Sequence, residues 1–261
     1  MLACIMASPM DLPQGLELAK LWAEIEPEFN PHVDIAFGLR FDMDPATVPG
    51  EIVQMLEKKF SKVHIFKSAL IGTGWPHGCN ALETGAYSWF VENRRGGVLD
   101  SDYLFMCEPD TIPLRPTWLN EIREEAYASG APIIGAYFTA EEGCAHINGN
   151  CVIHKDFWRI CPEIWQVPPM NGWDVYIGKK SLEVGKSSRL IWQDYRLGKP
   201  DNPWKGSDHL WEEKSYQGPN NPLYGQKLRP AMLHGIKTLE GIDAVRARYG
   251  LSNRVTHGNI S

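Results

Sequence analysis

The sequence has no apolar run approaching the roughly 20 residues that a transmembrane helix needs. Its N-terminus, MLACIMASPMD, forms only a short apolar stretch with no basic region before it. That pattern predicts a first β-strand instead of a signal peptide. We therefore expect a soluble protein in the cytoplasm that makes no contact with a membrane.

The sequence also has no excess of basic residues, and its six cysteines include no C-x-x-C pair. A net charge of -6 argues against a nucleic-acid coat protein, although it leaves room for a local basic face. Scattered cysteines in a cytosolic protein are expected to be reduced thiols. A zinc site is one alternative for Cys144, His146, Cys151 and His154, but their spacing matches no common zinc module.

Neither a Walker motif nor a clean dinucleotide-binding fingerprint is present. The glycine-rich residues 72–80, GTGWPHGCN, precede a predicted helix, and glycines there allow an anion to approach the backbone closely. A plain helix-entry turn explains them equally well. Internal repeats and low-complexity linkers are also absent, and 43% of the residues are hydrophobic, so the chain is expected to form one domain with a sizeable core.

Strand-like and helix-like segments alternate through the first half of the chain. The predicted strands and helices are, in chain order, residues 2–7, 12–25, 33–39, 49–60, 63–70, 80–93, 103–107, 117–128 and 132–138. This alternation predicts an α/β fold with a mostly parallel central sheet and helices on both faces. The second half is rich in Trp, Pro, Gly and Asn, which favours long loops over the scaffold.

Two carboxylates follow the predicted buried strand 103–107, in the segment Glu108-Pro109-Asp110. In open sheets of this kind, ligands bind beyond the carboxyl ends of the strands. Carboxylates two residues apart supply the oxygen ligands that Mg²⁺ and Mn²⁺ prefer, and these ions keep positions open for substrate phosphates. The segment therefore predicts a divalent-cation site for a nucleoside diphosphate. The alternative is a strand-end turn with two solvated acids.

The order of elements around this segment resembles that of the GT-A glycosyltransferases, over most of the chain. In that fold a strand ends in an Asp-x-Asp-like motif that binds the metal and the diphosphate of a nucleotide-sugar. Glu108 and Asp110 stand at that place, and because Glu replaces the first Asp, Asp110 is the safer ligand. The resemblance implies one GT-A-like, Rossmann-like domain, with residues 1–110 binding the nucleotide-sugar and residues 111–261 binding the acceptor.

A second motif supports the resemblance near the C-terminus. His234 and Lys237, in the segment LHGIK, are similar to the late histidine and lysine that some GT-A enzymes place on the metal and the diphosphate. Imidazole suits Mn²⁺, and a lysine is a point charge suited to phosphate. The resemblance further implies that the donor, for which we expect a UDP-sugar, contacts residues after the first strands and in the glycine-rich loop: Ser8, Arg40, Asp42, His77 and Asn80.

The acceptor is expected to contact residues beyond the strand 132–138. There the family has a further strand, in which Asn148 and Asn150 are candidates for hydrogen bonds with hydroxyl groups; a polar hairpin turn is the alternative. In inverting GT-A enzymes a later carboxylate deprotonates the acceptor, and Asp174 has that place in the order, beside Trp173 as a stacking platform. If Asp174 is a helix N-cap instead, the enzyme is retaining or Asp208 is the base.

Tryptophans and basic residues in the second half bear on the nature of the acceptor. The basic residues form one local stretch, which contains Lys179, Lys180, Lys186, Arg189, Arg196 and Lys199. Aromatic side chains interleaved with basic ones track a nucleic-acid strand in some proteins. Small phage enzymes of this type glycosylate hydroxymethylated pyrimidines in DNA, so a DNA acceptor in the host cytoplasm stands beside a glycan or small molecule. A solvated face is the structural alternative.

Two other functions would use the same residues. A nucleotidyltransferase on a related sheet should carry a basic loop after its first strand, but residues 7–14 contain no Lys or Arg. A carbohydrate- or DNA-binding protein without enzymatic activity would bind through the tryptophan-rich loops, indifferent to metal and nucleotide. The placement of two carboxylates at the end of a parallel strand makes this binding protein the least favoured of the three functions. The resemblance implies a metal-dependent glycosyltransferase, which is inverting if Asp174 is the base.

Overall fold

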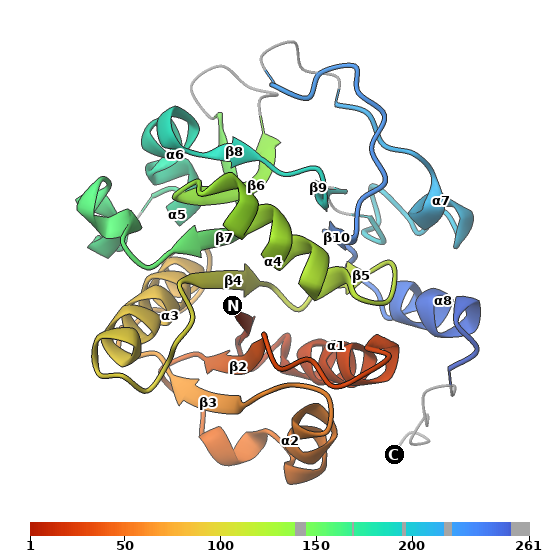
Figure 1. Ribbon diagram of the computed structural model, residues 1–261, viewed down its shortest axis with the longest axis horizontal. Coiled ribbons are helices and arrows are strands. Elements are labelled where there is room, and N and C mark those ends of the chain that lie inside the picture. Colours follow the sequence, from red (N-terminus) through yellow and green to blue (C-terminus); the bar gives the residue numbers. More distant parts are fainter. Residues whose placement is uncertain (139–144, 169, 195–196, 217–220, 252–261) are drawn as a thin grey trace.

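The computed structural model describes residues 1–138, 145–168, 170–194, 197–216 and 221–251 (Figure 1). A seven-stranded sheet has the order β3-β2-β1-β4-β7-β6-β8, and a smaller sheet has the order β5-β10-β9. The strands are β1 (Leu2–Ala7), β2 (Asp34–Leu39), β3 (Val63–Lys67), β4 (Tyr103–Cys107), β5 (Thr111–Pro113), β6 (Ile133–Phe138), β7 (His146–His154), β8 (Lys186–Ser187), β9 (Ile191–Gln193) and β10 (Met232–His234).

Helices connect most of these strands. The α-helices are α1 (Leu12–Ile25), α2 (Gly50–Glu57), α3 (His77–Arg95), α4 (Trp118–Ser129), α5 (Trp173–Tyr176), α6 (Gly178–Val184), α7 (Asp208–Trp211) and α8 (Glu240–Arg248). Short 3-10 helices are η1 (Pro45–Thr47), η2 (Phe157–Arg159) and η3 (Pro162–Trp165). Among the described residues, none of the helices has the length and apolar character to span a membrane.

The predicted α/β class and mostly parallel sheet are confirmed. Strands β3, β2, β1 and β4 run parallel to one another, and β7 is inserted antiparallel between β4 and β6. The predicted elements 2–7, 12–25 and 103–107 have the predicted bounds. The predicted strand 63–70 ends earlier, at Lys67, and the Ser68 hydroxyl that follows it donates to the Ala81 carbonyl of α3 at 3.0 Å.

The central strands are buried on both faces, as the parallel arrangement requires. Successive side chains of β1 point to opposite faces, so Ala3 and Ile5 join one apolar cluster while Leu2 and Cys4 join the other. The first cluster also contains buried side chains of α1, α2, α4 and α8, and the second contains those of α3 and α5. The sheet is therefore covered on both faces, as predicted.

Helix α3 lies unusually close to the end of β3. A Cβ atom on Gly85 would lie 2.0 Å from the Ser68 Oγ atom, so a larger residue there would push the helix away. This contact fixes the first half of α3 against the carboxyl end of the sheet. Glu83, two residues before Gly85, is also buried and lies near the end of β4.

The small sheet returns the C-terminal part of the chain to the end of β4. Strand β10 (blue in Figure 1) pairs antiparallel with β5, which begins directly after the Glu108-Pro109-Asp110 segment. The register places His234 opposite Thr111. The backbone N–H groups of Gly235 and Ile236 then donate to the Asp110 carbonyl, at 3.2 and 2.9 Å. Residues more than 120 apart in sequence are thereby locked side by side.

Candidate active site

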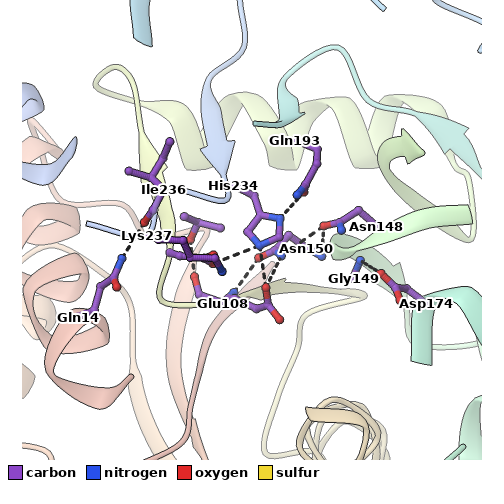
Figure 2. A network of polar contacts seen from close by, with 12 residues as sticks. Gln14, Glu108, Asn148, Gly149, Asn150, Asp174, Gln193, His234, Ile236 and Lys237 are labelled. Atoms are coloured by element: carbon purple, nitrogen blue, oxygen red, sulfur yellow. Dashed lines mark hydrogen bonds and ion pairs between the residues drawn. The ribbon is translucent and has the colours of Figure 1, made fainter. Parts of the chain in front are cut away.

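Three potential metal ligands meet at the exit of β4. One ligand atom each from Glu108, Asp110 and His234 lies within 4.8 Å of the others, and this is the one such group of His, Cys, Asp and Glu side chains found among the described residues. The His234 Nε2 atom is 2.7 Å from Glu108 Oε2 (Figure 2). It is also 3.2 Å from Asp110 Oδ1. The predicted pair of carboxylates and the late histidine are therefore brought together by the fold.

The chemistry of these atoms fits a divalent cation. Asp110 Oδ1 and His234 Nε2 are both buried and lack a hydrogen-bond partner, although they lie in ion-pair range of each other. Two such atoms that point at each other at close range, without the geometry of a hydrogen bond, have the arrangement of ligands around a metal ion. Two carboxylates with one imidazole form a donor set that suits Mn²⁺, and the carboxylates also suit Mg²⁺.

Neighbouring side chains hold the three ligands in place. Gln193 Oε1 is hydrogen-bonded to His234 Nδ1, and since an amide oxygen only accepts, Nδ1 carries the proton and Nε2 points at the carboxylates. Asn150 Oδ1 accepts from the Glu108 backbone N–H at 2.7 Å, and its Nδ2 donates to Glu108 Oε2 at 3.2 Å. The ligand set is therefore oriented by residues of β9 and β7.

Charges within this group shift its protonation strongly. Burial alone would raise the pKa of Asp110, but the nearby His234 and Lys237 outweigh burial and hold it far below its ordinary range. Burial alone would lower the pKa of His234, but the carboxylates of Asp110 and Glu108 raise it to about 10. Lys237 Nζ forms an ion pair with Asp110 Oδ2. Without a metal ion, two cations therefore neutralise the carboxylates.

The predicted donor residues lie after β1 and β2 and at the start of α3. The Ser8 N–H donates to Asp11 Oδ1 at 2.5 Å, in the turn that leads into α1. Arg40 and Asp42 form a two-bond ion pair, with both N···O distances 2.7 Å. His77 is exposed at the first position of α3. These residues surround the carboxyl ends of the strands, and their contact with a donor stays a prediction.

Asn80 has a supporting position in the structure. Its side chain is buried and donates to the carbonyl oxygens of Pro168 and Asn171, at 2.6 and 2.8 Å, while it accepts from the Trp173 N–H at 2.7 Å. These three bonds engage both polar atoms of the amide, so Asn80 ties α3 to the segment before α5. The structure thus gives it a role in shaping the site, and no free polar atom for the predicted donor contact.

The predicted acceptor residues fall into two groups. Asn148 is partly exposed on β7, and its Oδ1 accepts from the Asn150 N–H at 3.1 Å. Asn150 is 1% exposed and bonded to Glu108, so it orients a metal ligand, and the predicted hydroxyl contact does not fit its burial. Trp173 is fully buried in the apolar cluster under α3, which corrects the prediction of an open stacking platform.

Asp174 lies in α5 beside Gly149 of β7. Its Oδ2 accepts from the Gly149 N–H at 2.9 Å and lies 3.4 Å from His146 Nε2, while its Oδ1 accepts from the Val175 N–H. Burial alone would raise the pKa of Asp174, but these partners, His146 first, bring it below its ordinary value. The carboxylate is therefore ionised. Asp174 bonds within the first turn of α5 and also reaches across to the sheet.

Other residues singled out by the sequence lie elsewhere. Asp208 is exposed at the start of α7. In the basic stretch, Lys180 pairs with Glu183 and Lys186 donates to the Ser129 carbonyl, while Arg196 lies outside the described residues. Cys144 of the zinc alternative also lies outside the described residues. The contacts of Lys180 and Lys186 are those of a solvated face.

Two residues of the site were missed by the sequence reasoning. Gln193, which orients His234, carries no sequence signal beyond its place after an apolar pair. Glu83 did carry one: it is an acid on the stripe formed with Ala86, Tyr87 and Phe90, the buried face of α3. The buried face of a helix normally carries apolar residues, and an acid there is a departure of the kind expected at functional sites.

Comparison with known proteins identifies the fold. No protein-family model matches the chain, and no curated protein matches its sequence. Among solved structures, the galactosyltransferase LgtC in complex with donor and acceptor sugar analogues is similar, with 10% identity, a TM-score of 0.54 and 97% of each chain covered. Mouse xyloside xylosyltransferase 1 matches with 10% identity, a TM-score of 0.50, and 89% of this chain and 96% of its own covered.

A third solved structure is also similar to the chain. The bifunctional glycosyltransferase WbbM matches as well, with 11% identity and a TM-score of 0.54, over 89% of this chain and 45% of that protein. The chain therefore has the fold of the GT-A glycosyltransferases. The resemblance inferred from the order of elements and the Glu108-Pro109-Asp110 segment is confirmed at the level of fold.

Proposed function

We propose that the protein is a divalent-metal-dependent glycosyltransferase that moves a sugar from a nucleoside diphosphate to a hydroxyl group. The observation that carries this proposal is the convergence of Glu108, Asp110 and His234 at the end of β4, with Lys237 beside them. Ligands bind at this end of the strands in open α/β sheets. The GT-A fold supports the same reaction class.

The chain's own residues have distinct tasks in this reaction. Asp110 and His234, with Glu108, would hold Mn²⁺ or Mg²⁺, while Gln193 and Asn150 keep the ligands oriented. When bound, the metal ion neutralises the diphosphate that leaves with the nucleoside. Lys237, which forms an ion pair with Asp110, would supply a second positive charge to the same diphosphate. Residues from both halves of the chain, 1–110 and 111–261, build this centre.

The nucleoside is proposed to lie over the ends of β1 and β2. Ser8, Arg40 and Asp42 border that region in hydrogen-bond or ion-pair contacts that a ribose or base can exchange. His77 is exposed beside them. A uridine nucleotide is our proposed donor. Binding of UDP in preference to GDP or CMP in a thermal-shift screen with Mn²⁺ checks this choice.

Asp174 is proposed as the general base of an inverting transfer. The acceptor oxygen attacks the anomeric carbon, the bond from that carbon to the diphosphate oxygen breaks, and Asp174 takes the acceptor proton. Its low pKa keeps it ionised at neutral pH, which a proton acceptor requires, although it makes a weaker base. Asn148, partly exposed on β7, is proposed to bind the acceptor.

Asp174→Asn is expected to lower kcat by about 10²- to 10⁴-fold while the affinity for the donor is unchanged. The amide keeps the shape of the side chain and an oxygen for the Gly149 N–H, so the fold should be retained. Transfer kinetics with a thermal unfolding curve check this. A kcat within threefold of the wild type would show that Asp174 is not the general base and that its contacts only support the local structure. Inversion is checked separately, by the anomeric configuration of the product.

Metal binding is expected to release about one proton at pH 7. His234 is protonated in the metal-free protein because its pKa is raised to about 10, whereas a metal ligand must be a neutral imidazole. The apparent affinity for Mn²⁺ should therefore rise with pH, by about tenfold for each pH unit, over the range in which His234 is protonated in the metal-free protein. Calorimetric titrations in two buffers of different ionisation enthalpy measure the proton count. A count near zero would contradict this protonation state.

Product analysis separates the reaction classes. Release of a nucleoside diphosphate supports sugar transfer, whereas release of pyrophosphate would identify a nucleotidyltransferase. The DNA acceptor is tested with a hydroxymethylcytosine oligonucleotide beside simple glycosides, with the same donor and Mn²⁺. Modification of the oligonucleotide alone would assign DNA as the acceptor, and modification of the glycosides would assign a glycan.

A further inference from the structure

A buried acid in α3 has no partner in the described part of the protein. Glu83 is 8% exposed, and none of the hydrogen bonds or ion pairs there involves its carboxyl group. Its neighbours on the same helix face, Ala86, Tyr87 and Phe90, belong to the apolar core. An acid in such a place destabilises a fold unless it is hydrogen-bonded.

Glu83 and Asp174 converge on one point of β7. A Cβ atom on Gly149 would lie 2.8 Å from Glu83 Oε1 and 3.6 Å from Asp174 Oδ2. Any residue other than glycine at this position would therefore displace the Glu83 carboxyl group. The absence of a side chain at Gly149 keeps this acid in place beside the proposed base.

The surroundings of Glu83 define its position relative to the metal centre. Burial first, and then the negative charges of Asp174 and Glu108, raise the pKa of Glu83 well above its ordinary range. Gly149, beside the Glu83 carboxyl group, donates its N–H to Asp174, and the next residue, Asn150, donates to Glu108 Oε2. The acid thus lies near the proposed base and near a proposed metal ligand. A protonated carboxyl group there both donates and accepts a hydrogen bond.

We propose that Glu83 binds a hydroxyl group of the transferred sugar and selects which sugar the enzyme accepts. This inference rests on the proposed function. The sugar is bonded to the diphosphate at the metal centre and must also be reached by the acceptor at Asp174, so it lies between those groups. Glu83 lies in the same region and has no hydrogen-bond partner among the described residues. A hydroxyl group of the sugar would supply that partner.

The test uses two substitutions with opposite expectations. Glu83→Gln keeps the shape and both hydrogen-bonding functions, whereas Glu83→Met keeps the approximate shape and removes them. Glu92→Gln is the matched control, because Glu92 is an exposed acid on the same helix. Affinities are measured with Mn²⁺ for UDP, GDP and CMP, and for a panel of UDP-, GDP- and CMP-sugars. The thermal midpoint of each variant is recorded as well.

Wild type and Glu92→Gln should bind one nucleotide-sugar more tightly than its relatives that differ at one hydroxyl group. Glu83→Met should lose that preference by about tenfold or more, with unchanged affinity for the nucleotide alone, and Glu83→Gln should retain most of it. Glu83→Met should also melt about 2–4 °C higher, because a buried acid without a partner is gone.

Two results would overturn the inference while leaving the proposed function intact. The first is a wild type that binds all sugars of one nucleotide equally. The second is a Glu83→Met protein that keeps the wild-type ranking of sugars. If none of the nucleotides or nucleotide-sugars binds with Mn²⁺, the proposed function itself fails, and the role of Glu83 falls with it.

Discussion

Asp110→Asn is expected to reduce sugar transfer by at least about 10³-fold. A bound metal ion contributes several kcal/mol of charge stabilisation to a departing diphosphate, and each 1.4 kcal/mol corresponds to a factor of ten in rate. The substitution removes one negative charge from a centre in which His234 and Lys237 already balance the two carboxylates. An amide oxygen in that position binds a divalent cation poorly. Initial rates across a range of Mn²⁺ concentrations measure the loss.

Asp102→Asn is the matched control for this substitution. Asp102 lies directly before β4, at the opposite end of the strand that Asp110 follows, and its carboxylate pairs with Lys155 on the surface. This variant should transfer sugar within about twofold of the wild type, since surface ion pairs contribute about 0–1 kcal/mol. If the Asp110→Asn protein folds, binds the donor and transfers sugar at the wild-type rate, Asp110 is not a ligand of the metal ion.

Lys237→Met is expected to have opposite effects on the metal and on the donor. Lys237 forms an ion pair with Asp110 Oδ2 and therefore competes with a metal ion for this carboxylate. Its removal should strengthen the binding of Mn²⁺ alone. The same change removes a cation from the diphosphate, and a lost hydrogen bond to a charged group weakens binding by about 10- to 100-fold.

Two titrations separate these effects in the Lys237→Met protein. Calorimetry with Mn²⁺ alone should give a lower Kd than in the wild type, and calorimetry with a nucleoside diphosphate at saturating Mn²⁺ should give a higher one. Lys20→Met is a suitable control, because Lys20 forms its ion pair with Glu17 within α1. Weaker binding of both ligands would show that Lys237 only supports the local structure.

The fold was predictable where the chain repeats a simple pattern. Strands such as β1 and β4 are buried on both faces and read as continuous apolar runs, and the helices between them have the spacing of one apolar face. The strands β8, β9 and β10 have two or three residues each, too few for a pattern. They exist because distant segments pair with them, as β5 pairs with β10.

The site was predictable where position along a strand determines chemistry. Asp110 and Glu108 follow from the exit of a buried strand, and His234 came from the resemblance to a family. Burial decides the roles of Asn150 and Trp173, and burial is set by tertiary packing that the sequence does not display. Both were therefore predicted as ligand contacts, although Asn150 holds Glu108 and Trp173 fills the core.

The central claim is a metal-dependent site for a nucleoside diphosphate at the end of β4. A thermal-shift titration of UDP, GDP and CMP with Mn²⁺, and again with excess EDTA, tests it most directly. We predict that a nucleoside diphosphate raises the thermal midpoint only when Mn²⁺ is present, and that Asp110→Asn abolishes this shift. The account is contradicted if the shift persists in excess EDTA, or if it survives in the Asp110→Asn protein.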